Sequence, residues 1–86
     1  MIKSGEFKLW LKSNTAYSDA VIGDVLSRIK RADGMLCWDD ADTYLFYLER
    51  EERFGALSGS VRSQIRKAVK LYAEYRKETL NDQTAV

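Results

Sequence analysis

The segment from residue 58 to residue 77 reads as one long amphipathic helix in a chain of 86 residues. Its apolar side chains recur every three or four residues, which is the period of one helix face. They are Val61, Ile65, Ala68, Val69, Tyr72 and Tyr75. The sequence contains no proline, which favours long uninterrupted helices over a turn-rich β fold. We therefore expect a helical protein in which this segment is the longest element.

The same period recurs elsewhere and predicts an all-α fold. It places further helices at about residues 4–12, 18–33 and 39–53, before a last helix at about 58–78. Residues 80–86 show no period and predict a frayed tail. Each predicted helix has one apolar stripe and the connections are short, so we expect a compact four-helix bundle, a single domain over residues 1–86.

Polar residues and glycines mark the expected helix ends. Ser18 is suited to cap the second helix, and Ser58 or Ser60 to cap the last. Gly34 and Gly55 stand where glycine often ends a helix.

Composition limits the chemistry that the chain can perform. Histidine is absent and Cys37 is the single cysteine, which excludes Ser/His and Cys/His nucleophilic pairs, zinc sites and an internal disulfide. The acidic residues Asp39, Asp40 and Asp42 lack calcium-loop spacing and are better explained as capping the helix that follows. We expect no enzymatic activity, no metal and no cofactor. Cys37, beside Trp38, is expected to be a small buried hydrophobe.

The chain carries no apolar run of the roughly 18 residues that a membrane span requires, and no signal peptide is visible. A cytoplasmic protein without a membrane partner is therefore expected. No small-molecule ligand is evident from the sequence.

The charges are segregated although the formal net charge is only +1. Residues 56–77 hold six lysines or arginines against one glutamate, whereas residues 39–53 hold six acidic residues against two arginines. At 100° per residue, the cations of the last helix cluster away from its apolar side. They are Arg62, Arg66, Lys70 and Lys77, with Lys67 beside them. Such a stripe can follow the phosphates of a nucleic acid, and the alternative is an ordinary solvated helix face.

Other residues can extend that surface. Ser60 and Ser63, near the start of the last helix, can add hydroxyl contacts to phosphate. Arg28, Lys30 and Arg31 end the second helix, where they either complement its dipole or continue the basic surface if the two helices lie side by side.

Phe46 and Tyr47 lie off the apolar side of the helix predicted over 39–53. Exposed neighbouring aromatic residues can anchor a protein partner. The alternative is that Phe46 covers the outer edge of the core.

Four stretches, taken together, resemble a known DNA-binding module. They are residues 7–11 (FKLWL), 17–30 (YSDAVIGDVLSRIK), 44–48 (YLFYL) and 60–75 (SVRSQIRKAVKLYAEY). A short first helix, a second helix beginning at serine, an intermediate helix and a last helix ending in aromatics make up this pattern. The pattern resembles the SAM-like core-binding N-terminal domain of phage integrases and other tyrosine recombinases, over about residues 5–78.

The resemblance implies a non-catalytic domain that contacts double-stranded DNA through its second and last helices. Carried over by position, the contacts fall on Arg28, Lys30, Arg31, Ser60, Arg62, Ser63, Arg66, Lys67 and Lys70, and Lys77 continues the stripe. The catalytic arginines, histidines and tyrosine of that family lie in a separate domain that no stretch here resembles. The chain is expected to be a recombinase domain or a free-standing mobile-element protein.

The net charge of +1 departs from the more basic balance usual for that family. The acidic segment would repel a DNA backbone, so DNA is expected on the side away from it. The alternative function is a small protein-interaction module, or a phage or mobile-element regulator, that uses this acidic segment with Phe46 and Tyr47.

Overall fold

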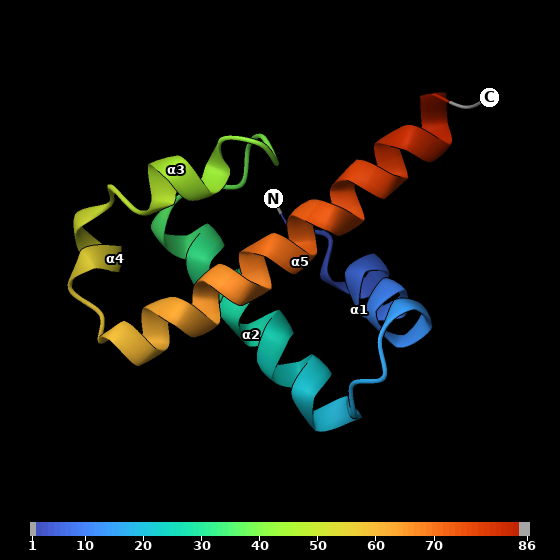
Figure 1. Cartoon of the computed structure of the whole chain (residues 1–86), viewed down its shortest axis with the longest axis horizontal. Coiled ribbons are helices and arrows are strands. Elements are labelled where there is room, and N and C mark those ends of the chain that lie inside the picture. Colours follow the sequence, from blue (N-terminus) through green and yellow to red (C-terminus); the bar gives the residue numbers. More distant parts are fainter. Residues whose placement is uncertain (1, 85–86) are drawn as a thin grey trace.

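The computed structural model describes the chain from residue 2 to residue 84, with side chains to residue 79, and this part is helical without strands. Its helices are α1 (Ser4–Asn14), α2 (Asp19–Met35), α3 (Tyr44–Leu48), α4 (Glu52–Gly55) and α5 (Gly59–Thr84). Figure 1 shows α2 and α5 crossing at the centre, with α1 on one side and α3 and α4 on the other. Three longer helices and one segment with two short helices therefore surround a single core.

The serine caps form as the sequence indicates. Ser18 Oγ accepts a hydrogen bond of 3.3 Å from the Val21 N–H, and Ser58 Oγ accepts one of 3.3 Å from the Val61 N–H. Ser58 rather than Ser60 therefore caps α5.

The predicted helix end at Gly34 and the predicted frayed tail are wrong, whereas a helix does end at Gly55. Gly34 lies inside α2 and Gly55 is the last residue of α4, and no described glycine has a positive φ. At its end, α2 stops because Leu36 adopts extended backbone. No glycine or proline follows Glu78, so α5 continues through Thr84, because each added residue gains a backbone hydrogen bond. Residues 85–86 of the predicted tail lie outside the described residues.

The single helix predicted over 39–53 is also wrong. Tyr44, Leu48 and Phe54 are all buried, but a continuous helix would place Phe54 about 120° around the axis from Leu48. The chain instead breaks at Glu51, whose backbone is extended, and α4 then brings Phe54 back to the core.

The aspartates before α3 do not act as side-chain caps of its backbone. The Asp40 carbonyl accepts the N–H groups of Thr43 and Tyr44 in a turn, and its carboxylate accepts the Thr43 hydroxyl. The segment is tied to α2 because Arg53 donates to the Met35 carbonyl at 2.9 Å. Cys37 is exposed, contrary to the prediction, because the adjacent Trp38 occupies the inward position.

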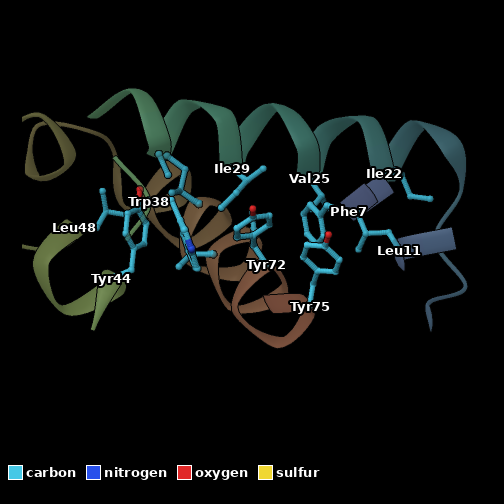
Figure 2. Packing of buried hydrophobic residues seen from close by; sticks show 14 of the residues in the cluster. Phe7, Leu11, Ile22, Val25, Ile29, Trp38, Tyr44, Leu48, Tyr72 and Tyr75 are labelled. Atoms are coloured by element: carbon cyan, nitrogen blue, oxygen red, sulfur yellow. The ribbon is translucent and has the colours of Figure 1, made fainter. Parts of the chain in front are cut away.

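A row of aromatic rings forms the centre of the core (Figure 2). Tyr72 of α5 stands in the middle, with ring centroids 4.9 Å from Phe7 of α1 and 4.6 Å from Trp38 of the loop after α2. Trp38 in turn lies 4.6 Å from Tyr44 of α3. Figure 2 shows α2 covering this row with Val25 and Ile29. One ring of α5 thus contacts the elements on both sides of the fold.

Polar contacts at the edge of this row join α1 to α5. The Tyr72 hydroxyl accepts the Lys3 N–H at 3.1 Å, and the Tyr75 hydroxyl donates to Glu6 Oε2 at 3.0 Å. Trp10 Nε1 donates to the Glu78 carboxylate. Helix α1 is therefore held against the part of α5 between Tyr72 and Glu78.

Replacing Tyr72 with alanine tests the central ring. We expect Tyr72→Ala to lower the free energy of unfolding by about 3–5 kcal/mol, because the ring contacts are lost and a cavity remains. Chemical denaturation measures the change. The matched control is Tyr47→Ala at an exposed ring, which should change it by no more than about 0.5 kcal/mol. Equal losses in both variants would contradict the central role of Tyr72.

The buried tyrosines predict alkaline destabilisation. Burial, and then the negative charge of Asp33, raises the pKa of Tyr44 above its ordinary value of 10.0, and burial with the Glu6 contact raises the pKa of Tyr75. Since the folded pKa values are raised, this stability is complete below about pH 10 and is lost as the pH rises through them. Chemical denaturation across pH 8–11 should therefore show that the free energy of unfolding of wild type falls as the pH rises, and that the fall is smaller in Tyr44→Phe/Tyr75→Phe. The control Tyr47→Phe should show the same fall in the free energy of unfolding as wild type.

Candidate nucleic-acid interface

The cations of α5 do not form one continuous face. Arg66 Nε donates to Glu49 Oε1 at 2.6 Å, and Lys77 Nζ pairs with Asp42 Oδ1 at 2.7 Å. The contact with Asp42 raises the pKa of Lys77. Two predicted DNA contacts thus have carboxylate partners from the acidic segment. Charges that are separate in the sequence meet in the fold, and the acidic segment borders the basic helix.

Arg66 is restrained from a second side as well. Its guanidinium carbon lies 5.5 Å from the centre of the Phe54 ring in α4. The side chain therefore connects α5 both to α4 and to Glu49 just after α3.

Arg62 lies on the same flank of α5, 40° from Arg66 around the helix axis by the 100° step. Its Nε is buried and has no hydrogen-bond partner in the described part of the chain. A terminal guanidinium nitrogen lies 3.9 Å from the place where a Cβ on Gly59 would stand, so the side chain lies back along the first turn. Arg62 is only half-exposed and less available to a partner than the sequence suggests.

The outward face of α5 carries the remaining predicted residues. Ser60, Ser63 and Lys67 follow at intervals of three and four residues and are exposed, and Lys70 follows one turn later. Neither lysine makes an ion pair within the described residues, although the exposed Glu74 continues the face. Two hydroxyls and two ammonium groups are therefore presented along one line of the helix.

A small cleft of about 60 Å³ lies between α2 and α5. Arg28 of α2 and Lys67 and Gln64 of α5 line it, together with Tyr17 from the preceding connection. Apolar side chains complete the lining, which contains no acidic residue: Val21, Val25 and Ala68. The cleft brings a cation of the second predicted cluster beside a cation of the first.

The rest of the cluster on α2 divides between two flanks. By the 100° step, Arg31 lies about 60° around the helix from Arg28, whereas Lys30 lies about 160° away. All three are at least half-exposed. Arg31 can therefore extend the surface around the cleft, but Lys30 leaves the helix on the opposite flank.

Phe46 and Tyr47 form an exposed aromatic pair on α3. Their side chains are 53% and 57% exposed, and their rings meet edge to face at 5.3 Å. The Arg50 guanidinium lies 3.5 Å above the Phe46 ring and donates to the Phe46 carbonyl at 2.9 Å. The interpretation that Phe46 covers the core is therefore wrong.

The structure adds surface features that helical projection of single segments did not indicate. Tyr17 and Gln64 line the cleft because of how α2 and α5 cross, and no sequence signal marks that crossing. A groove of about 270 Å³ also runs between α5 and residues 41–45, with an apolar floor under a charged rim. Its lining consists of Ala41, Asp42, Leu45, Val69, Lys70, Ala73, Glu74 and Lys77.

No described helix is both long and apolar enough to cross a membrane. Among the side chains that the structure describes, residues 2–79, no group of three or more Cys, Asp or Glu is placed to hold a metal ion.

Comparison with protein-family models, with curated proteins and with solved structures gave no match to this chain. The resemblance to the core-binding domain of tyrosine recombinases therefore stays a prediction from the sequence.

Proposed function

We propose that this chain is a non-catalytic DNA-binding domain of the integrase core-binding type, which contacts duplex DNA through α2 and α5. The observation that supports this proposal is the cleft between α2 and α5 that Arg28 and Lys67 both line, with no acidic residue in its lining. Two cations from different helices give a fixed positive site, and phosphate is the group that such a site attracts in DNA.

The proposed contact surface is smaller than the one the sequence suggests. It consists of the cleft cations Arg28 and Lys67 with Arg31 and Lys70, and the hydroxyls of Ser60 and Ser63. Lys30 faces the other flank of α2, while Arg66 and Lys77 have carboxylate partners. Four cations imply a slope of log K against log salt of about −3 to −4, so binding is weak and strongly salt-dependent.

The proposal assigns no chemistry to the tyrosines of α5. The Tyr72 and Tyr75 rings are buried in the core, and their hydroxyls contact Lys3 and Glu6. They stabilise the helix that presents the DNA contacts.

Charge reversal in the cleft tests the proposal. Wild type should bind a labelled duplex at roughly tens of micromolar protein in about 50 mM salt, measured by fluorescence anisotropy. The variant Arg28→Glu/Lys67→Glu should bind at least about tenfold more weakly, because it removes two phosphate contacts and adds repulsion.

The matched control is Lys8→Glu/Lys30→Glu, which has the same net charge but alters exposed residues away from the cleft. Its affinity for duplex DNA should fall by no more than about threefold, since only the long-range electrostatic attraction changes. Absent wild-type binding, or equal losses in the two variants, would rule out this surface.

The exposed pair of Phe46 and Tyr47 supports a second candidate function, a protein-interaction module. Both rings are more than half-exposed, and aromatic anchors of this kind dominate binding energy at protein interfaces.

Pull-down experiments separate the two candidates. If α3 is an interface, the immobilised wild-type chain retains a partner that Phe46→Ala/Tyr47→Ala loses, because the anchors are gone. Arg28→Glu/Lys67→Glu should keep that partner. Thermal denaturation checks that the alanine variant stays folded, and retention by the alanine variant would contradict an interface at this pair.

A further inference from the structure

The acidic segment places two carboxylates where DNA phosphates would meet α5. The Glu49 contact with Arg66 and the Asp42 contact with Lys77 are 2.6 Å and 2.7 Å long, so both are close ion pairs at or below the short end of the usual distance for a charged N–H group and a carboxylate. A phosphate oxygen uses the same donors at similar distances. The segment thus supplies an internal anion to each of two cations.

We propose that the acidic segment, residues 39–53, is an autoinhibitory element that competes with DNA for α5. Asp42 and Glu49 hold Lys77 and Arg66 until phosphates displace them, and the displaced cations then enlarge the contact surface. This inference rests on the proposed function.

The two pairs lie open to the solvent, so a phosphate can reach them. The side chains of Lys77 and Asp42 are 56% and 71% exposed, and those of Arg66 and Glu49 are 34% and 41% exposed. Exposed ion pairs contribute little to stability, so an incoming phosphate has little to overcome. Of the two cations, Arg66 is held more firmly because it also lies over Phe54.

The exchange requires movement of side chains only. Tyr44, Leu48 and Phe54 anchor the segment in the core and are buried. The carboxylates can turn away while α3 and α4 stay in place.

The released cations would adjoin the proposed surface. By the 100° step, Lys77 lies about 20° and Arg66 about 40° around α5 from Lys70, on the side away from Lys67. Arg66 and Lys77 are also about 16 Å apart along the helix axis, so the contact surface lengthens as well as widens. Four available cations become six.

Neutralising the two carboxylates tests this inference. We expect Asp42→Asn/Glu49→Gln to bind duplex DNA about three- to tenfold more tightly than wild type, because the competing anions are gone. The slope of log K against log salt should steepen by about one to two. Fluorescence anisotropy at several salt concentrations measures both.

The matched control is Asp39→Asn/Glu52→Gln, which makes the same charge change at exposed residues of the same segment that form no ion pair in the described part of the chain. Its affinity should change by no more than about twofold and its slope should stay at the wild-type value. Thermal denaturation verifies folding, and if the double variant unfolds, Asp42→Asn alone provides the test.

A double-mutant cycle tests whether the gain in DNA affinity arises at Lys77. Lys77→Gln should weaken DNA binding more in the Asp42→Asn background than in wild type, where Lys77 is paired with Asp42. Additive effects would show that Asp42 does not act through Lys77.

The outcomes distinguish this inference from the proposed function. If wild type binds through Arg28 and Lys67 but the neutralised variant is no tighter than its control, the inference is wrong and the proposed function stands. If neither wild type nor the neutralised variant binds DNA, both are wrong.

Discussion

The packing of the Tyr72 ring between Phe7 and Trp38 is the contact on which the rest of the structure depends. The ring joins α1 on one side and the loop before α3 on the other to α5, with centroid distances of 4.9 Å and 4.6 Å. Aromatic contacts of this kind add specific geometry to the area they bury. Helix α5 also packs directly against α2, and Arg28 and Lys67 line the cleft between these two helices.

Hydrophobic period alone was sufficient to find α1, α2 and most of α5, because each keeps one apolar stripe, but it did not predict the last turns of α5, which lie beyond that stripe. It failed for residues 39–53, where the buried positions Tyr44, Leu48 and Phe54 do not fit one helix face. The separation of six residues between Leu48 and Phe54 does not fit one helix face. This conflict could be recognised as a helix break only once it was known that both side chains are buried in the same core. The exposure of Cys37 also depends on the core, because Trp38 is the residue of the pair whose side chain is buried there.

The candidate site could be predicted only in part for a related reason. A helical projection gives the direction of each cation on its own helix, and it correctly left Phe46 and Tyr47 off the core. It gives no information on what lies beside the helix. The partners of Arg66 and Lys77 come from a segment that was expected to face away, and Tyr17 and Gln64 enter the cleft through the crossing of α2 and α5. Charge segregation along the sequence was therefore a poor guide to charge segregation in space.

The contacts between α1 and α5 have a consequence for the order of folding during synthesis. Lys3 contacts Tyr72, Glu6 contacts Tyr75 and Trp10 contacts Glu78, and 68 or 69 residues separate the partners of each pair. Closing such long loops costs more chain entropy than forming local helix contacts. A nascent chain can form α2 early, but Phe7 and Leu11 have no complete core to enter until α5 has left the ribosome. Packing of α1 into the core is therefore coupled to the synthesis of α5.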